Sequence, residues 1–434
     1  FAVEVMKLRY KSNDLHRSLL HELCWDFSGP MLFQYVWWIL KTAQERKINR
    51  LYFMARDGYL LLRIAERFCE KFSLPIELRY LYCSRTSLRM PSYCLIGKEA
   101  DELLLQGGYQ VSLHSLLQRA GLDKTQQKMV CADGNIDQIN GDRLLSRSEQ
   151  EKVCDALRNS TVFHNCVCEK SRAAYDSAIG YLRQEGLLDQ DKVVLVDSGW
   201  TGSMQRSLRQ LLQSAGFSGC LIGFYFGMYA APKESVDGTY LTWFFNREGI
   251  MADKIAFCNN LFECILSAPH GMTISYRQET EKYIPILLPD PTEKELQTID
   301  KQIHGVLDYC DGKLRQISFE EFDPTRSKQD TRRRIWRYMA HPTRKEASHW
   351  GKFLFCDDVT EGYHLSLANC EQVNILKGYS IPARAVRRIL RRPVREVMPE
   401  LLWPYGTIAF LPWWKQWWYR LNVYVWEWLR YTLR

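Results

Sequence analysis

The stretch that decides the fold of this chain is Val193-Val194-Leu195-Val196-Asp197-Ser198-Gly199-Trp200-Thr201-Gly202-Ser203. Its four apolar, mostly β-branched residues predict a fully buried central strand of a parallel sheet. Residues 204–212 have the apolar spacing of an amphipathic helix, so the strand runs through a loop of small residues into a helix. Ligands of open α/β sheets bind at the carboxyl ends of the strands, so we expect Asp197 and the loop after it at a binding crevice.

The loop after this strand has the composition of a phosphate-binding loop. Its glycines and its helix start offer backbone N–H groups to an anion, and its serine and threonine residues add hydroxyl groups. The predicted substrate-binding residues of this loop are Ser198, Gly199, Trp200, Thr201, Gly202 and Ser203. The alternative is an ordinary strand-to-helix turn that binds no ligand.

A second unit of the same kind precedes it. Residues 51–55 are predicted to form a strand, Arg56-Asp57-Gly58 a sharp loop, and residues 59–70 a helix. Arg56 is suited to a bidentate contact with a phosphate, and Gly58 allows the backbone to approach an anion. Asp57 is suited to capping the helix or to holding a metal ion. The alternative is that Asp57 only caps the helix and that Arg56 is a surface charge.

A third strand, residues 78–83, ends in Ser84-Arg85-Thr86-Ser87, and Ser84 and Arg85 are predicted substrate contacts. A further strand is predicted over residues 221–227. Strands that end in polar loops and alternate with helices predict an α/β fold with a mainly parallel, doubly wound, Rossmann-like sheet. A helical insertion and a helical C-terminal region complete the predicted fold.

The chain of 434 residues is long enough for more than one folding unit. We expect an N-terminal helical segment (1–50) packed on the sheet and a donor-binding α/β core (51–275), with a helical insertion over about 95–190. A helical region (276–380) follows a linker marked by Pro285, Pro289 and Pro291, and its first helix begins at Asp290-Pro291. A basic, Trp-rich tail (381–434) ends the chain.

The composition, 46% apolar and 25% charged residues with a net charge of +8, is that of a globular protein. The 14 cysteines follow no regular framework, which predicts reduced thiols in a cytosolic protein and argues against a cysteine-bound metal. The sequence contains no run of 18 apolar residues, so it predicts no membrane-spanning segment. The chain begins at Phe1 without a signal peptide, which is typical of a fragment of a longer product.

Glu263 and His270 lie in a polar island of an otherwise apolar region. A partly buried carboxylate or imidazole is suited to acid–base catalysis, so Glu263 is a predicted catalytic residue, with Asp57 and Asp197, and His270 a predicted substrate contact. The alternative is a Glu that packs against a helix and a loop His with its hydrogen bonds satisfied.

The tail is both basic and aromatic. Half of the 14 tryptophans lie after residue 400. The arginines that precede them are Arg384, Arg387, Arg388, Arg391, Arg392 and Arg395. As a helix, residues 413–434 place Trp414, Trp417, Trp418 and Trp428 on one face, a pattern typical of contact with an anionic membrane surface. The alternative is that this face docks on the protein itself or on a partner; no groove-reading motif for nucleic acid accompanies it.

The chain resembles the type I phosphoribosyltransferases in three loops that follow in the same order: Ala55-Arg56-Asp57-Gly58, Ser84-Arg85 and residues 194–203. The resemblance implies that Arg56, Asp57 and Gly58 bind pyrophosphate and its Mg²⁺, with Asp57 as the metal ligand. It also implies that Asp197 binds the ribose hydroxyls and that residues 201–203 bind the 5-phosphate. The family usually has two adjacent acids where this chain has Asp197-Ser198.

Over residues 25–275 the chain is also similar to a predicted hydrolase family of bacterial polysaccharide loci, through its Phe-x-Ala-Arg-Asp-Gly and Val-Asp-x-Gly-Trp-x-Gly segments. Such proteins often carry a phosphatase unit of the haloacid dehalogenase type; no Asp-x-Asp start of that kind follows a predicted strand here, so we expect this chain to lack that phosphatase chemistry. The resemblance implies a cytoplasmic transferase, peripheral at the inner face of the cell membrane, that moves a phosphoribosyl group from phosphoribosyl pyrophosphate to a polysaccharide or lipid-linked glycan acceptor. The alternatives are a nucleotide-sugar glycosyltransferase and a non-catalytic, sugar-phosphate-binding scaffold.

Overall fold

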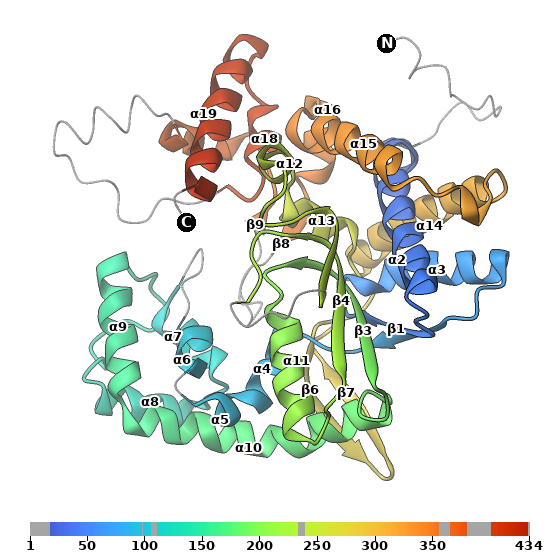
Figure 1. Ribbon diagram of the computed structural model, residues 1–434. Helices are drawn as coiled ribbons and strands as arrows, with labels where there is room; N and C mark the ends of the chain where they lie inside the picture. The colour runs from blue at the N-terminus through green and yellow to red at the C-terminus, as the bar shows by residue number, and fades with distance from the viewer. Residues whose placement is uncertain are drawn as a thin grey trace.

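The computed structural model describes residues 18–97, 99–105, 111–232, 239–355, 365–379 and 401–432. At its centre is a five-stranded, all-parallel sheet with the strand order β2-β1-β3-β4-β5 (Figure 1). The strands are β1 (Arg50–Met54), β2 (Glu77–Leu81), β3 (Lys192–Trp200), β4 (Cys220–Met228) and β5 (Tyr240–Phe245). The prediction of an α/β fold with a parallel sheet is confirmed. β5 is not among the predicted strands, although its run of aromatic residues is typical of one.

Both faces of the sheet are covered by helices because successive side chains of each strand point to opposite sides. Leu51 and Phe53 of β1 belong to one buried cluster, whereas Tyr52 and Met54 belong to another. The first cluster contains side chains of α2 (Gly29–Glu45), α3 (Gly58–Phe72) and α14 (Glu293–Leu314). The second contains side chains of α10 (Thr161–Gln184) and α11 (Ser203–Ser214). The sheet is therefore doubly wound, with its strand ends free to form a crevice.

In the described residues the N-terminal helical segment is continuous from α1 into α2. Ser18 caps α1 (Leu19–Leu23), and a π-helical turn (Cys24–Ser28) connects α1 directly to α2. Gly29 lies at this junction because a Cβ there would approach the Tyr309 ring of α14 to 2.9 Å.

The insertion after β2 has a hydrophobic core of its own. Its helices are α4 (Arg85–Arg89), α5 (Tyr93–Ile96), α6 (Glu99–Leu104), α7 (Leu113–Arg119), α8 (Lys124–Asp133) and α9 (Arg147–Asn159), with a 3₁₀ turn at Met90–Ser92. The long helix α10 belongs to both units. Phe163 and Val167 pack in the insertion, whereas Ala178 and Leu182 pack under the sheet, so α10 joins the two cores (Figure 1).

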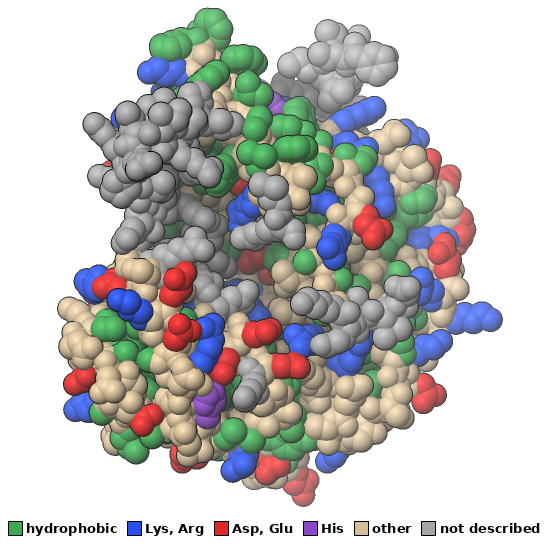
Figure 2. Space-filling view, turned by 60° about the vertical axis from the view of Figure 1, so that its left-hand side comes forward, with side chains coloured by type: hydrophobic (Ala, Val, Ile, Leu, Met, Phe, Trp, Pro, Cys, Tyr) green, Lys and Arg blue, Asp and Glu red, His purple; other side chains and the backbone are tan. Residues whose placement is uncertain are grey.

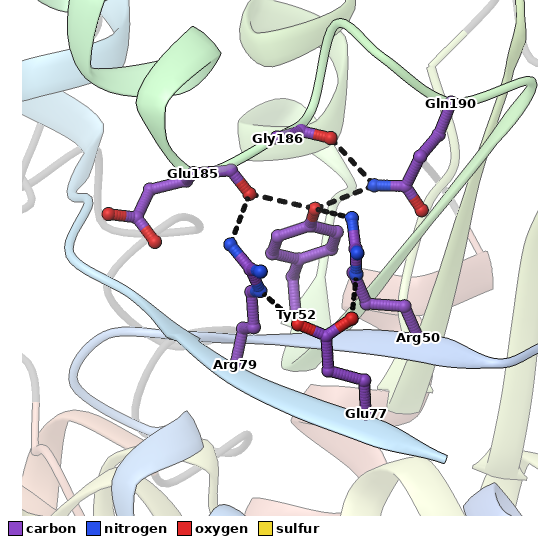
Figure 3. Close-up of polar contacts among 7 residues, drawn as sticks. All are labelled: Arg50, Tyr52, Glu77, Arg79, Glu185, Gly186 and Gln190. Carbon is purple, nitrogen blue, oxygen red and sulfur yellow. Dashed lines mark hydrogen bonds and ion pairs between the residues drawn. The ribbon is translucent and has the colours of Figure 1, made fainter. Parts of the chain in front are cut away.

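The end of α10 is held at the sheet by a polar network (Figure 3). The Tyr52 hydroxyl of β1 donates to the carbonyl oxygen of Glu185 at 2.9 Å and accepts from Nε2 of Gln190 at 2.7 Å. Arg79 of β2 donates to the same carbonyl at 3.1 Å and pairs with Glu77. Since Glu185 is the C-cap of α10, this network fixes the helix to the two strands whose far ends carry Arg56 and Ser84.

Two predictions after residue 250 are wrong. Pro285, predicted to mark a linker, lies in a hairpin of β6 (Thr273–Glu279) and β7 (Lys282–Leu287), where it pairs with Tyr276. A two-stranded ribbon has free edges, so it tolerates a residue that lacks an N–H group. The cap of α14 is Thr292, whose hydroxyl accepts from the Glu295 N–H, and not Asp290, whose carboxylate accepts from Gly271 instead.

The remaining elements gather at one end of the sheet (Figure 1). They are α12 (Met251–Ala256), α13 (Asn259–Ile265), a 3₁₀ turn (Phe319–Glu321), α15 (Pro324–Ile335) with a π-helical turn (Trp336–Ala340), α16 (Arg344–Trp350), β8 (Leu354–Phe355), β9 (Leu365–Ser366), a 3₁₀ segment (Glu371–Tyr379), α18 (Pro404–Ile408) and α19 (Trp413–Thr432). The arginine cluster of residues 384–395 lies outside the described residues. In the described part of the chain, no helix combines the length and the apolar character needed to span a bilayer.

The α19 helix docks on the protein by one face and exposes the other. Val423 is fully buried, and the Tyr431 ring stacks on Tyr229 with 5.4 Å between the ring centroids. In the first turns of the helix, by contrast, Trp413 is 84% and Trp417 is 68% exposed. The tryptophan face predicted from the sequence therefore points away from the body of the protein, and the self-docking alternative applies to the other face.

Gly58 is the first residue of α3, and a Cβ there would lie 2.7 Å from the carbonyl carbon of Phe53. We expect Gly58→Ala to destabilise the protein by about 1–3 kcal/mol, because the clash is with backbone that cannot move aside. Gly312→Ala in α14 is the matched control, since its Cβ would make only an ordinary contact with Trp25 at 3.4 Å. Urea unfolding measures both; equal stabilities would contradict the expected close approach.

Candidate functional site: an acidic pair at the β1/β3 crevice

The strand order reverses between β1 and β3; Asp57 lies in the loop after β1, and Asp197 lies in β3 just beyond the residues that pair with β1. The two segments are linked directly, because the Ser198 hydroxyl donates a short hydrogen bond to Oδ2 of Asp57. Asp57 is the N-cap residue of α3, yet its side chain caps no helix N–H. The capping alternative therefore does not account for its carboxylate. Neither aspartate is fully covered, so a ligand in the crevice can reach both.

Burial raises the pKa of both carboxyl groups, because protein atoms replace most of their hydration. At Asp197 the negative charge of Asp57 adds to this effect, and together they raise its pKa to about 7. The Ser198 hydrogen bond and the charges of Arg56 and Arg85 act in the opposite direction on Asp57. The two aspartates therefore form an acidic pair that changes its protonation near neutral pH.

The predicted cations Arg56 and Arg85 lie near this acidic pair. Arg56 lowers the pKa of Asp57, and Arg85 lowers that of both aspartates, so each guanidinium acts on the crevice. Ser84 has a different place. Its hydroxyl caps α4 by accepting from the Ser87 N–H at 3.1 Å and donates to the carbonyl of Thr273 at 2.5 Å. These two bonds account for the Ser84 hydroxyl and leave its predicted contact with substrate without support.

The loop after Asp197 differs from the prediction in its first half. The strand continues to Trp200, and Gly199 and Trp200 still pair with β4. The backbone N–H groups of Ser198 and Gly199 donate hydrogen bonds to the Asp197 carboxylate and lower its pKa. Because they are engaged there, these two N–H groups are not available to bind a phosphate. Gly199, at φ +116°, is required by the sheet, because a Cβ would lie 2.3 Å from the Gly227 carbonyl oxygen.

Trp200 has a left-handed backbone, with φ of 81°, which is uncommon for a bulky residue. Its indole Nε1 donates to Oε1 of Glu263 at 2.6 Å, and its ring lies 5.3 Å from that of Phe257. Glu263 thus holds Trp200 in place, a role that differs from the predicted acid–base one. Strained backbone of this kind is concentrated at functional sites.

The second half of the loop opens α11. Gly202 is its N-cap, with φ of 66°, and offers no side chain to cap the helix. Thr201 is exposed, and its hydroxyl donates to Ser203 Oγ at 3.4 Å. Ser203 Oγ also accepts from Nη2 of Arg89 at 3.1 Å. This half of the loop thus has the glycine, the helix N-terminus and the hydroxyl groups of the predicted phosphate-binding loop.

His270 lies beside β2. Its Nε2 is 2.8 Å from the Tyr80 hydroxyl, and its ring contacts those of Tyr59 and Tyr82. Burial lowers the pKa of His270, and the nearby charge of Arg56 lowers it further, so the imidazole is neutral at pH 7. The structure thus brings His270 to the Arg56 side of the crevice, engaged with a tyrosine.

Two residues of the site are absent from the sequence prediction. The Tyr35 hydroxyl of α2 is within hydrogen-bond distance of the carbonyl oxygens of Asp197 (2.8 Å) and Phe224 (3.0 Å), which fixes β3 beneath the crevice. Arg89 reaches the start of α11 from the end of α4. Tyr35 lies in an apolar helix and Arg89 in a short polar helix. Their neighbours in the sequence therefore do not indicate that either residue lies at the site.

The acidic pair fits a magnesium ion. Mg²⁺ is commonly held by one or two carboxylates, with waters and substrate phosphates completing its six ligands. Asp57 and Asp197 supply two such carboxylates. Among the described residues no group of three or more His, Cys, Asp or Glu side chains forms a complete metal site, so substrate oxygens would be needed.

Comparisons with models of known protein families and with curated proteins found no match to this chain. The two family resemblances therefore stay predictions. The residues of the crevice are the basis on which a function is assigned below.

Asp197→Asn is expected to stabilise the protein at pH 8 by about 2–4 kcal/mol. The folded protein holds a proton on Asp197 up to pH near 7, whereas an unfolded chain releases it near pH 4, so the wild type loses stability as pH rises between these values. The gain of the variant should shrink towards pH 4. Thermal unfolding from pH 4 to 8 measures it, with the exposed Asp191→Asn as control; a gain independent of pH would contradict the shifted pKa.

Proposed function

We propose that this protein is a magnesium-dependent transferase that moves a phosphoribosyl group from phosphoribosyl pyrophosphate to a polysaccharide or lipid-linked glycan. The observation that carries the proposal is the acidic pair, Asp57 and Asp197, joined through Ser198 at the crevice where the strand order reverses. Arg56 and Arg85 add positive charge beside it. Acidic and basic groups together suit a ligand that brings both a cation and phosphate oxygens.

Each residue of the crevice has a distinct part in this reaction. Asp57 and Asp197 would hold Mg²⁺, which neutralises pyrophosphate charge when bound. Arg56 would donate hydrogen bonds to the pyrophosphate as it departs with the electron pair of the broken C–O bond. The anomeric carbon becomes cation-like as that bond breaks, and an acceptor hydroxyl then forms the new C–O bond.

The acceptor hydroxyl must lose a proton in that step. A carboxylate whose pKa lies near 7 is suited to take it, because it is ionised at neutral pH yet basic enough to bind a proton. Burial raises the pKa of both aspartates, that of Asp197 to about 7, so whichever carboxylate does not bind Mg²⁺ is the candidate base. Glu263 is a weaker choice because it is engaged with Trp200.

Binding of the donor tests the proposal. We expect phosphoribosyl pyrophosphate with Mg²⁺ to bind the wild-type protein in a calorimetric titration, and Arg56→Ala and Asp197→Asn each to weaken binding by about 10-fold or more. Arg63→Ala is the matched control, because Arg63 lies on α3 with Glu66 as its partner, and binding should not change. Binding should also weaken from pH 8 to pH 6 as the acidic pair takes up protons.

Other results would favour the alternatives. Tighter binding of uridine or cytidine diphosphate would support a nucleotide-sugar glycosyltransferase. Donor binding without turnover in the presence of a glycan acceptor would support a sugar-phosphate-binding scaffold. Absence of donor binding at millimolar concentration would remove the proposal.

We also propose that α19 holds the protein against an anionic membrane surface, at the inner face of the cell membrane. Its outward face carries exposed apolar side chains, visible in green at the top of Figure 2: Trp413, Trp414, Trp417, Trp418, Leu421 and Trp428. Lys415 lies among them, 4.8 Å from the Trp414 ring centroid. Tryptophan rings with neighbouring cations suit the headgroup region of a bilayer containing anionic lipid.

Replacing Trp413, Trp414 and Trp417 together by Ser tests this contact. We expect the wild type to sediment with vesicles containing phosphatidylglycerol and the triple variant to remain in the supernatant. Point variants are preferable to removal of residues 381–434, because Val423 and Tyr431 of α19 belong to the packed body. Met129→Ser, an exposed apolar residue of α8, is the control. Equal sedimentation of all three proteins would exclude α19 as the membrane contact.

A further inference from the structure

A pocket of about 100 Å³ lies between α12, α18 and the second half of α19, in the upper part of Figure 1. Tyr229, Tyr405, Trp426 and Tyr431 contribute aromatic rings to its lining. The helices α18 and α19 follow residue 275, so the resemblance to known families, which ends there, implies nothing about this pocket. Neither aspartate of the acidic pair lines it, so the pocket is a second site.

The charged side chains of the pocket are one acid, Glu427, and two bases, Lys254 and Arg430. Nη1 of Arg430 lies 3.6 Å from Oε1 of Glu427, and the two side chains are 38% and 17% exposed. Nζ of Lys254 donates to the carbonyl oxygen of Arg247. In the parts of the chain that the structure describes, no Asp or Glu pairs with Lys254. The pocket therefore presents charges of both signs.

The Glu427 carboxylate lies near the tyrosines of the pocket. Burial raises the pKa of the Tyr229 and Tyr405 hydroxyls, and the negative charge of Glu427 raises both further. Asn259 adds to the polar lining, because its Nδ2 donates to Oδ1 of Asn260 at 3.0 Å and its own Oδ1 remains as an acceptor. The pocket thus combines aromatic rings with both donors and acceptors of hydrogen bonds.

This mixture of charges decides which ligand fits. A phosphate group would meet the negative charge of Glu427, and an ammonium group would meet the positive charges of Lys254 and Arg430. A sugar ring avoids both conflicts, because it is neutral and its hydroxyl groups both donate and accept hydrogen bonds. Its C–H face can pack on flat tyrosine and tryptophan rings, which are apolar in the middle and polar at one end. The volume of the pocket admits a single ring and excludes a whole nucleotide.

We propose that this pocket binds one sugar residue of a glycan. The sugar ring packs on the aromatic lining, and adjacent hydroxyl groups bond to the carboxylate of Glu427 and the guanidinium of Arg430. Oδ1 of Asn259 accepts a hydrogen bond from a further hydroxyl.

The place of the pocket suits the glycan acceptor of the proposed transfer. The Tyr229 ring lies 6.0 Å from the ring of Trp200, which follows Asp197 in β3. The exposed tryptophans proposed to contact the membrane belong to the same helix as Glu427 and Arg430. The pocket therefore lies between the proposed membrane contact and the strand that carries the acidic pair. Its role as the acceptor site rests on the proposed function, whereas carbohydrate binding rests on the pocket alone.

Methyl glycosides of glucose, galactose, mannose, rhamnose and N-acetylglucosamine are the probes, because they carry no phosphate and no lipid. In saturation-transfer NMR titrations of the full chain, we expect at least one of them to bind. Glu427→Gln, which conserves the shape of the side chain, and Arg430→Met should each weaken this binding about 10-fold or more. Glu66→Gln is the matched control, because Glu66 and Arg63 form an ion pair of the same i,i+3 spacing on α3, outside the pocket.

Vesicle binding separates a sugar from a lipid headgroup. If the pocket held a lipid phosphate, Glu427→Gln would remove a repulsion and strengthen sedimentation with phosphatidylglycerol vesicles beyond that of Glu66→Gln, which changes the net charge equally. We expect no such difference. That difference, an unchanged sugar affinity in Glu427→Gln, or no glycoside bound at about 100 mM would each overturn the carbohydrate site. Absence of phosphoribosyl pyrophosphate binding would remove the proposed function and leave the carbohydrate site standing.

Discussion

The parallel pairing of β1 with β3 is the constraint on which the rest of the structure depends. These strands pair through Tyr52 with Leu195 and Phe53 with Val196, and this pairing reverses the strand order and places Asp57 and Asp197 at one crevice. The strands must be apolar on both faces because helices cover both. Their polar residues are therefore confined to the ends, and the chemistry of the protein is confined there too.

Burying the charged groups of the crevice lowers the stability of the folded protein. Desolvation penalises both aspartates, and among the described residues a serine hydroxyl, backbone N–H groups and two nearby arginines act against it. Arg89, from a different segment, is buried and donates to Ser203 at the start of α11. A bound cation would relieve the mutual repulsion of the two aspartates.

The C-terminal helix shows how one pattern can serve two contacts. Its tryptophans suggest an apolar face that must be covered, and the rule that apolar faces pack inward would turn them towards the protein. The body instead contacts Val423 and, near the end of the helix, Tyr431, so most of the tryptophan surface remains outside. Periodicity along a helix describes its faces, but the partner of each face depends on what the rest of the chain presents to it.

The sequence by itself determined the elements whose signal is local. The apolar runs of β1, β3 and β4 and the periodic helices after β1 and β3 can be recognised from the sequence, as can the polar character of the strand ends, because a strand buried on both faces admits few polar residues. It also pointed to Arg56, Asp57, Asp197 and Arg85. The linker predicted from Pro285 is wrong, because a proline that would break a central strand is tolerated in a two-stranded ribbon.

Only the tertiary structure decided which polar groups face one another. That Ser84 caps a helix, that the Gly199 N–H turns to Asp197 and that Glu263 holds Trp200 depend on contacts between segments far apart in the chain or on the turn of the backbone. The raised pKa values of the acidic pair and the burial of Arg89 arise in the same way, because desolvation and Coulomb interactions depend on distances in space that spacing along the chain does not contain.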